Sequence, residues 1–240
     1  MDEEFTCQIL CMAQVKSVAK AAICVFAKPP IAGTAKTRLI PSIGKERAAQ
    51  LADAFLQDTL MVLRTLPWAR SIVAATEPFT KDYIPDGCMW IQPEGSLDIR
   101  LETILRRALM QYPMAFAIGA DSPGLPAMYL DQAKALLASH DAVLGSSRDG
   151  GFYLLGVKHS PPGLLKGIQW SQPTTFHKTL SRLREQGLSV GLIPEWFDVD
   201  TETDLSYLRH LLSNGMVACR CTQAIMRKIN QSNPSTLTAQ

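Results

Sequence analysis

The chain has 240 residues, enough for one sizeable α/β domain or for two small ones. Its hydrophobic content of 47% and charged content of 19% are those of a globular protein. The net charge of +2, from 24 basic and 22 acidic side chains, excludes a bulk electrostatic attraction to nucleic acid or to an anionic membrane. Any affinity for phosphate groups must therefore come from local clusters of cations.

Apolar runs of strand length alternate along the chain with longer segments of helical periodicity. The predicted strands span residues 21–27, 71–76, 88–93, 115–119, 141–145, 151–157 and 188–194. Helices are predicted over 45–66, 96–111 and a segment around 176–183, followed by a last helix that begins after Thr201 with a capping box to Asp204. Several strands are apolar throughout, which is typical of parallel sheets covered on both faces. The alternation predicts a three-layer αβα sandwich with a mostly parallel central sheet.

The chain ends differ from this pattern. We expect one domain over residues 21–215, an N-terminal extension over 1–20 and a peripheral C-terminal tail over 216–240. The chain opens with MDEE, which is acidic where a secretory signal carries positive charge, and no apolar run approaches the roughly 18 residues of a membrane span. These features predict a cytoplasmic protein without a membrane span.

The cysteines agree with a reducing compartment. Cys24 lies in an apolar run and is predicted to be a buried thiol. Cys7, Cys11, Cys219 and Cys221 have CxxxC and CxC spacings, which differ from the paired CxxC of a zinc ribbon. We expect these four to be accessible reduced thiols near the chain ends, and a four-cysteine metal site that joins the ends is the alternative.

The loop after the first strand has the composition of a phosphate cradle. Such a cradle needs backbone N–H donors, a small residue for close approach and cations. The stretch FAKPPIAGTAKTRLIP supplies them through Lys28, Gly33, Thr34, Lys36, Thr37 and Arg38. Its spacing is neither GxxxxGK[ST] nor GxGxxG, which excludes a P-loop and a Rossmann fingerprint. Because the cations precede a helix N-terminus, whose dipole they oppose unless an anion lies between, we predict a bound phosphate; a solvated basic turn is the alternative.

Carboxylates follow other predicted strands. Open α/β sheets bind ligands at the carboxyl ends of their strands, and Mg²⁺ usually takes one or two protein carboxylates together with phosphate oxygens. Asp121 with Asp200 or Asp198 could therefore hold a metal on a diphosphate. A turn role for Asp121 and a capping role for Asp200, directly before Thr201, are the alternatives.

The segment Asp149-Gly150-Gly151 lies between two predicted strands. Asp-Gly is a standard hairpin signal, so the segment is consistent with a simple turn. Adjacent glycines also allow a sugar or a base to approach the backbone closely.

Four separated motifs together resemble one family. FAKPPIAGTAKTRL (26–39), DSPGL (121–125), DGGFYLLG (149–156) and DVDTETDL (198–205) have the order and spacing of a glycosyltransferase-like group in the nucleotide-diphospho-sugar transferase superfamily, which has the GT-A fold. Wider relatives include phospholactate guanylyltransferases, which share the basic KTRL loop, and molybdenum-cofactor guanylyltransferases. The resemblance covers residues from about 21 to 212.

The resemblance implies a nucleotide over the first half of the sheet, with Mg²⁺ or Mn²⁺ on its diphosphate. Lys28, Lys36 and Arg38 would contact the phosphates, helped by Gly33 and Thr37.

The resemblance also assigns the acidic residues. Asp121 would be a catalytic and metal-binding carboxylate, and Asp200, or else Asp198, would be the second metal ligand. Asp149 would be catalytic, with Gly150 and Gly151 beside it on the acceptor side.

One segment departs from the family pattern. The stretch GSLDIRL (95–101) stands where the family usually has a GDLGxRM-like sequence. The segment keeps Arg100, which the resemblance predicts to contact the nucleotide. The other differences from the family pattern leave the role of the segment open.

These observations predict a metal-dependent transferase that passes a glycosyl group from a nucleotide-diphospho-sugar to a small acceptor. One alternative is a guanylyltransferase-like nucleotidyltransferase that joins a nucleoside monophosphate, from a nucleoside triphosphate, to a phosphorylated small molecule. The other is a non-catalytic nucleotide-binding protein, which the altered GSLDIRL suggests and the retained carboxylates oppose. The sequence gives no indication of the oligomeric state.

Overall fold

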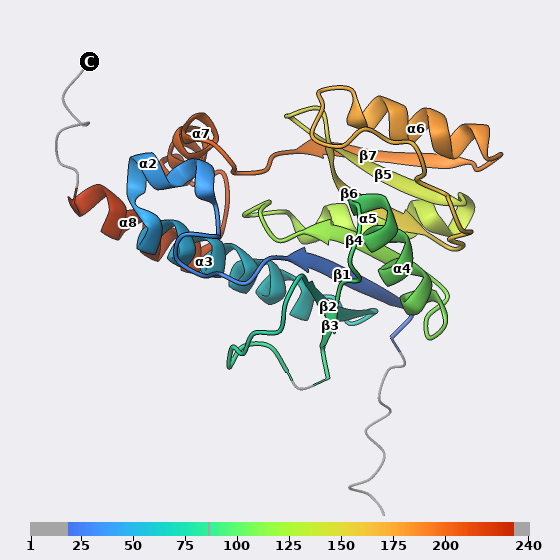
Figure 1. Ribbon diagram of the computed structural model, residues 1–240, viewed down its shortest axis with the longest axis horizontal. Helices are drawn as coiled ribbons and strands as arrows, with labels where there is room; N and C mark the ends of the chain where they lie inside the picture. Colours follow the sequence, from blue (N-terminus) through green and yellow to red (C-terminus); the bar gives the residue numbers. More distant parts are fainter. Residues whose placement is uncertain (1–18, 86, 233–240) are drawn as a thin grey trace, which may run out of the picture.

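A central sheet of seven strands organises the molecule. The computed structural model describes residues 19–85 and 87–232 and places helices on both faces of this sheet (Figure 1). The strands are β1 (Ala21–Ala27), β2 (Ala69–Ala75), β3 (Met89–Ile91), β4 (Ala115–Gly119), β5 (Ala142–Ser147), β6 (Phe152–Val157) and β7 (Val190–Trp196). The helices are the 3₁₀ helix η1 (Thr37–Leu39) and the α-helices α2 (Ile40–Ile43), α3 (Lys45–Arg64), α4 (Leu97–Leu109), α5 (Ala127–Ser139), α6 (Thr175–Glu185), α7 (Glu202–Ser213) and α8 (Arg220–Ser232).

All seven predicted strands are present, with small shifts at their ends, and the mostly parallel α/β sandwich is confirmed. The strand order is β3-β2-β1-β4-β6-β5-β7, and only β6 runs antiparallel, against both β4 and β5. The chain builds outward from β1 through β2 to β3 and then crosses to the other side of β1 with β4. The strand order therefore reverses between β1 and β4, where α/β sheets form their ligand crevice.

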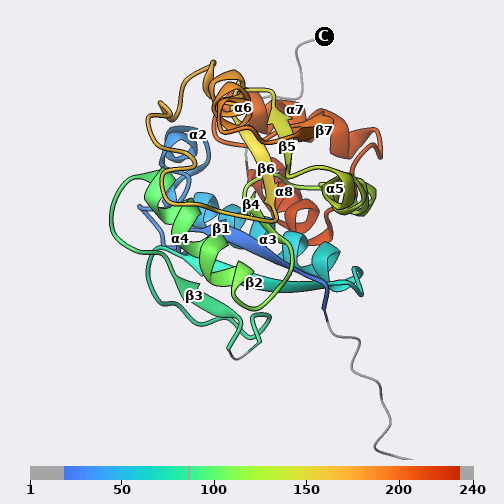
Figure 2. The ribbon, with the colours of Figure 1, turned by 90° about the vertical axis from the view of Figure 1, so that its right-hand side faces the viewer.

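Both faces of the sheet are covered, which explains the apolar strands. In β1, Ile23 and Val25 pack with α3 and α5, whereas Ala22 and Cys24 pack with α4 and α6. Helices α4 and α5 accordingly lie on opposite sides of the sheet (Figure 2). The prediction of a buried Cys24 thiol is confirmed, and its burial raises its pKa to about 12.

A third apolar cluster joins α2, α3, α7 and α8 at one end of the molecule (Figure 1). Val217, Cys219, Met226 and Ile229 are buried in it. The expectation of a peripheral tail is therefore wrong for residues 217–232, because the apolar face of α8 covers α3. The end of the domain at residue 215 stays a prediction.

The same burial corrects part of the cysteine expectation. Cys219 is buried, Cys221 is partly buried, and both are free thiols. Cys7 and Cys11 lie outside the described residues.

Asp58 of α3 attaches α8 to the domain. Its carboxylate accepts hydrogen bonds from the backbone N–H groups of Cys221, at 2.9 Å, and Thr222, at 2.8 Å. These N–H groups belong to the first turn of α8 and have no partner within the helix, so Asp58 caps α8 from a neighbouring element.

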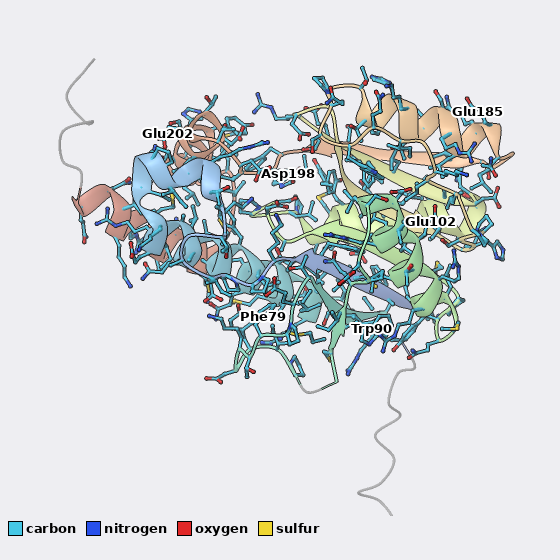
Figure 3. All side chains as sticks on the ribbon, in the orientation of Figure 1. Phe79, Trp90, Glu102, Glu185, Asp198 and Glu202 are labelled. Atoms are coloured by element: carbon cyan, nitrogen blue, oxygen red, sulfur yellow. The ribbon has the colours of Figure 1, made fainter. Side chains whose placement is uncertain are left out.

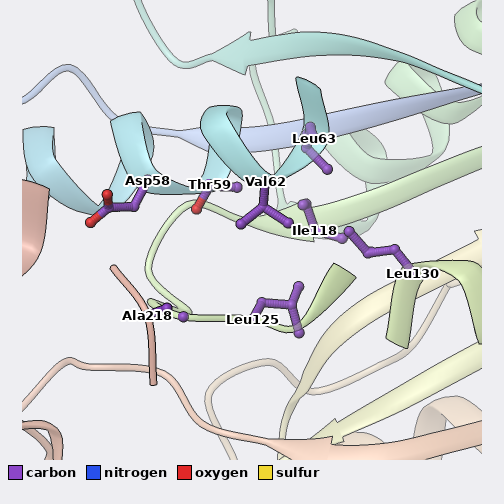
Figure 4. A pocket seen from close by; sticks show the side chains of 9 residues that line it. Asp58, Thr59, Val62, Leu63, Ile118, Leu125, Leu130 and Ala218 are labelled. Atoms are coloured by element: carbon purple, nitrogen blue, oxygen red, sulfur yellow. The ribbon is translucent and has the colours of Figure 1, made fainter. Parts of the chain in front are cut away.

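A small cavity lies beside this contact, between α3 and the loop that precedes α5. Figure 4 shows its lining side chains, with Asp58 and Thr59 on α3 and Leu125 and Ala218 across from them. Its volume of about 10 Å³ accommodates one water molecule at most. None of the helices in residues 19–85 and 87–232 combines the length and the hydropathy that a membrane span requires.

Candidate active site

The basic loop after β1 returns to the carboxyl edge of the sheet and places Lys36 between two carboxylates. The Lys36 Nζ lies 3.0 Å from Asp121 Oδ2 and 2.7 Å from Asp200 Oδ1. The Lys36 side chain is only 9% exposed, whereas those of Asp121 and Asp200 are 40% and 46% exposed. The cation therefore lies inside the site, and both carboxylates keep a solvent-accessible side.

Lys36 adopts an uncommon backbone conformation to reach this position. Its φ of +47° lies in the left-handed region, directly before η1. The loop is fixed on both sides of it by the buried side chains of Ala35 and Leu39.

The segment between β7 and α7 crosses the edge of the sheet. It brings the motif that contains Asp198 and Asp200 next to the motifs that contain Lys36 and Asp121. After β7 the chain turns back toward β4, and the Val199 N–H donates to the Asp121 carbonyl oxygen at 3.0 Å. Thr201 then caps α7 in the predicted capping box with Asp204, which is confirmed. Because Thr201 takes the capping role, the Asp200 carboxylate is available to Lys36.

Asp198 faces a different set of partners where the chain passes from β7 to α7 (Figure 3). Its carboxylate accepts a hydrogen bond from the Ser122 hydroxyl and another from Ser147 Oγ at 2.8 Å. Burial and then the charge of Asp121 raise the pKa of Asp198 to about 7, although the two serine hydrogen bonds act in the opposite direction. Through these two hydrogen bonds, Asp198 attaches the segment between β7 and α7 to the carboxyl ends of β4 and β5.

The charges of the site are mutually compensated. Burial would raise the pKa of Asp200, but Lys36, and then Arg38 and Lys28, hold it below its usual value. Burial would lower the pKa of Lys36, but Asp121 and Asp200 outweigh that effect and raise it. The three cations of the basic loop therefore act on one carboxylate, with Lys28 and Arg38 exposed to solvent.

The remaining residues predicted for the phosphate side lie in the same loop and on α4. Gly33 has a φ of +90° and is exposed, and Thr37 is exposed as the first residue of η1. Arg100 lies in the first turns of α4, and its Nε donates to the Gly95 carbonyl oxygen at 2.8 Å.

The segment 149–151 is the turn of the β5–β6 hairpin, and it is also fixed to a distant loop. Asp149 Oδ1 accepts a hydrogen bond from the Gly151 N–H at 2.8 Å. Gly150 has a φ of +88°, and a Cβ on it would meet the Pro173 carbonyl oxygen at 2.1 Å. The Gly150 carbonyl oxygen accepts from the Phe176 N–H at 2.8 Å. A side chain at position 150 would clash with Pro173, so packing within the protein is enough to require glycine there, without a ligand.

A cavity of about 200 Å³ lies next to the hairpin turn. Its wall includes Phe26, Gly119, Asp149, Phe152 and Trp170. Sequence reasoning gave its aromatic residues no role, although Phe26 and Phe152 lie in recognised motifs; Trp170 lies outside them. Sequence reasoning also missed Ser122 and Ser147, although both lie within or beside recognised motifs.

The residues present fit a divalent metal that binds together with a nucleotide. Asp121 and Asp200 each give one carboxylate oxygen to Lys36 Nζ and are partly exposed to solvent, so the other oxygen of each is available to a metal. Hard oxygen ligands of this kind suit Mg²⁺ or Mn²⁺. In the part of the chain that the structure describes, no group of three or more His, Cys, Asp and Glu side chains could hold a metal ion. Phosphate oxygens would therefore have to complete the coordination.

Comparisons with known proteins agree with the fold. The sequence profile of a family described as an uncharacterized protein conserved in bacteria (DUF2064) matches residues 59–172. A crystal structure of a "putative nucleotide-diphospho-sugar transferase" from Desulfovibrio desulfuricans G20 is similar with a TM-score of 0.79 and 28% identity, covering 89% of this chain and 96% of that one. No curated protein matches the sequence.

Two cytidylyl-transferring enzymes share the fold at lower identity. CMP:2-keto-3-deoxy-manno-octonic acid synthetase, solved with CTP, has a TM-score of 0.53 and 13% identity, over 82% of this chain and 99% of that one. The 4-diphosphocytidyl-2C-methyl-D-erythritol synthase from Anaerococcus prevotii has a TM-score of 0.52 and 13% identity, over 80% and 98% of the two chains. The protein described here thus has the fold of the nucleotide-diphospho-sugar transferase superfamily, and over residues 59–172 it matches the DUF2064 family.

Proposed function

We propose that the protein is a metal-dependent transferase that passes a glycosyl group from a nucleotide-diphospho-sugar to a small hydroxyl-bearing acceptor. One observation carries the proposal: Lys36 Nζ is held by Asp121 and Asp200 at the edge where the strand order reverses. Two carboxylates that share a cation beside further exposed cations match the charge pattern of a metal–diphosphate complex. The likeness to a 28% identical protein described as a "putative nucleotide-diphospho-sugar transferase" supports it.

On the nucleotide-diphospho-sugar donor, the carboxylates would bind the metal ion and the basic loop would contact the phosphates. Asp121 and Asp200 would hold Mg²⁺ or Mn²⁺, which neutralises charge on the diphosphate leaving group. Lys28, Lys36 and Arg38 would stabilise the same phosphates as the bond to the sugar breaks.

Asp149 would act on the acceptor. Its carboxylate takes the proton of the acceptor hydroxyl as that oxygen bonds to the anomeric carbon. The bond from the anomeric carbon to the phosphate oxygen breaks at the same time, and a nucleoside diphosphate leaves. The exposed position of Asp149 at the hairpin turn gives an acceptor access to its carboxylate.

Nucleotidyl transfer is a second candidate, because the two cytidylyl-transferring enzymes share the fold. In that reaction a phosphate oxygen of the acceptor attacks the α-phosphate of a nucleoside triphosphate, and pyrophosphate leaves. Mass spectrometry of the products separates the two reactions, since only glycosyl transfer releases a nucleoside diphosphate.

A thermal-shift screen tests the proposal. The probes are UDP-, GDP-, ADP-, CDP- and TDP-sugars and the nucleoside triphosphates, each with and without Mn²⁺. We expect one class to raise the melting temperature, and more so with Mn²⁺, because a ligand that binds only the folded state stabilises it. The transferase proposal fails if no nucleotide shifts the melting temperature in either condition.

The same thermal-shift measurement on variants tests which residues bind the metal and the nucleotide. Asp121→Asn should remove the Mn²⁺-dependent part of the shift, while Glu185→Gln on the exposed end of α6 should keep it. Arg38→Ala and Lys28→Ala should weaken nucleotide binding, and Arg184→Ala should not. Both loop cations are exposed, and their charges also help Lys36 to hold the pKa of Asp200 below its usual value. An unchanged Mn²⁺ response in Asp121→Asn would exclude Asp121 as a ligand.

A further inference from the structure

A groove lies on the solvent side of α6. Its walls are the exposed face of α6 and the turn at residues 166–169, in the loop between β6 and α6. Its volume is about 600 Å³. Small-molecule sites have volumes of roughly 300–1,000 Å³, so the groove has room for a small ligand.

The groove is separate from the candidate active site. None of its lining residues also lines the cavity next to the hairpin turn. Lys36, Asp121 and Asp200 are not among its lining residues either. Figure 3 shows Glu185, which lines the groove on α6, well away from Asp198. A ligand in the groove would therefore be distinct from a nucleotide bound at the carboxylates.

Cations predominate among the charged side chains of the groove. Lys166, Lys178 and Arg182 line it, and His177 adds an imidazole ring. Glu185 supplies the only carboxylate among the lining residues. The whole chain carries 24 basic and 22 acidic side chains, so this excess of positive charge is local. Such a cluster attracts anions, because each cation adds to the same local potential.

Two of these cations are held by neutral groups. Lys178 Nζ donates to Gln169 Oε1 at 2.6 Å, and Arg182 Nη2 donates to the Gly163 carbonyl oxygen at 3.0 Å. Over residues 19–85 and 87–232, neither they nor Lys166 form an ion pair with a carboxylate. The charges of Lys178 and Arg182 are therefore oriented but not compensated.

The missing ion pair matters most for Arg182. Its side chain is partly buried, whereas Lys166 and Lys178 are exposed. A partly buried charge is screened less by water and salt than an exposed one. The buried Arg182 Nε also has no acceptor in the described part of the chain, so hydrogen bonds satisfy this guanidinium only in part. An anion in the groove would stabilise the guanidinium by its charge, without contact to Nε.

The groove also offers neutral donors to an anion. Thr174 and Ser181 line it with exposed hydroxyl groups. Gly167 has a φ of +86°, and a Cβ on it would meet no atom within 4 Å, so a ligand can approach the backbone there. Among the lining residues, Ile168 has the only aliphatic apolar side chain, and it is buried. Phosphate oxygens accept from guanidinium, ammonium and hydroxyl groups together, so this lining suits a phosphate more than an apolar ligand.

We propose that this groove binds a small anion that carries more than one phosphate group, at a site additional to those of the proposed transferase reaction. Lys166, from the turn, and Lys178, from α6, would contact the phosphates on two sides of the anion. Arg182 would supply the third charge, one helical turn after Lys178. A single monovalent anion would leave this charge only partly compensated, which is why we assign several phosphate charges to the ligand.

An NMR titration of the metal-free protein tests the inference. Tripolyphosphate represents an inorganic ligand and fructose 1,6-bisphosphate an organic one, and citrate controls for charge without phosphate. We expect one or both phosphate probes to shift the backbone amide signals of the turn at 166–169 and of the exposed face of α6. The same probe should bind at least about tenfold more tightly than citrate. Shifts confined to the basic loop at 28–38, or equal affinity for citrate, would overturn the inference.

Charge variants locate the binding. Lys166→Gln and Lys178→Gln each remove one exposed charge and should weaken the phosphate probe about two- to fivefold, the range of one exposed ion pair. Glu185→Gln removes the opposing charge and should strengthen binding by a similar factor. Lys228→Gln is the matched control, because it removes an exposed lysine of α8, at the opposite end of the molecule from α6 (Figure 1). Equal effects of Lys178→Gln and Lys228→Gln would show that the binding is not in the groove.

The inference and the proposed function fail separately. Lys28→Ala and Arg38→Ala should leave binding in the groove unchanged, whereas Lys166→Gln and Lys178→Gln should keep the Mn²⁺-dependent nucleotide shift. If nucleotides raise the melting temperature but no phosphate probe shifts the groove amides, the anion site is wrong and the transferase proposal stands. If a phosphate probe binds in the groove but no nucleotide shifts the melting temperature, the transferase proposal fails and the anion site stands.

Discussion

At the scale of single residues, the site is dominated by a lysine that neutralises two carboxylates. The sequence assigned Lys36 to phosphate, and the structure places it in contact with Asp121 and Asp200. These contacts are compatible with the phosphate role, since an ammonium group has three donors and can add a phosphate oxygen to its two carboxylates. Without Lys36, Asp121 and Asp200 would repel each other at short range. The lysine therefore preorganises the pair that the proposed function assigns to the metal.

Asp198 makes the stability of the protein depend on pH. Its folded pKa of about 7 lies above its unfolded value of 3.8, so the folded state binds the proton more tightly. Stability from this group is present at low pH and is lost as pH rises from about 4 to about 7, with a slope of at most about 1.4 kcal/mol per pH unit. Asp198→Asn removes the titration. The free energy of unfolding of the wild type, minus that of Asp198→Asn, should therefore fall over this range and level off above it.

Urea denaturation at a series of pH values in EDTA measures this difference. Taking the difference between two proteins cancels the opposite slopes of Asp200 and Glu202, whose pKa values are lowered. Asp82→Asn, at an exposed position in the loop between β2 and β3, is the control and should run parallel to the wild type, because Asp82 is not among the groups that shift the pKa of Asp198. A difference that is constant from pH 4 to pH 7 would contradict the raised pKa.

At the scale of elements, α8 is held by a cap from another helix. The Asp58 carboxylate is buried and accepts from two N–H groups of the first turn of α8. Asp58→Ala leaves both N–H groups without this partner, and we expect it to lower the free energy of unfolding by about 1–3 kcal/mol. Asp58→Asn keeps one acceptor oxygen and should cost less.

Urea denaturation of the two variants checks this order. Asp82→Ala, at an exposed position in the loop between β2 and β3, is the matched control and should lie within about 0.5 kcal/mol of the wild type. If Asp58→Ala behaves like Asp82→Ala, the cap contributes nothing to the attachment of α8.

At the scale of the whole molecule, the sequence predicted the sheet because its signals are local. Runs such as 21–27 and 115–119 are apolar on both faces, and their burial in the structure matches that pattern. The capping box at Thr201 was equally readable, because its two partners are three residues apart. The positions of Asp121 and Asp200 at one edge followed from the rule for strand ends.

Helix α5 was not predicted, and other features that the sequence did not predict depend on contacts between distant segments. The pairing of Lys36 with Asp200 joins residues 164 apart along the chain, and no periodicity encodes it. The cap from Asp58 to α8 and the packing of Gly150 on Pro173 are of the same kind. Helix α8 was missed although Ile225, Met226 and Ile229 have a helical spacing, because the segment was assigned to a peripheral tail.

The packing of α8 gives a test of where the domain ends. A chain that stops at residue 215 loses four buried apolar side chains, Val217, Cys219, Met226 and Ile229. At about 1.5–3 kcal/mol for each buried side chain, the loss approaches the roughly 5–15 kcal/mol that stabilises a whole domain. We expect this shortened chain to show no cooperative thermal transition by circular dichroism. Ile229→Ala in the full chain should remain cooperative with a lower melting temperature, because it removes only part of one contact. A cooperative transition of the shortened chain near that of the full chain would show that residues 21–215 form the folding unit, as the sequence predicts, and that α8 is an addition to it.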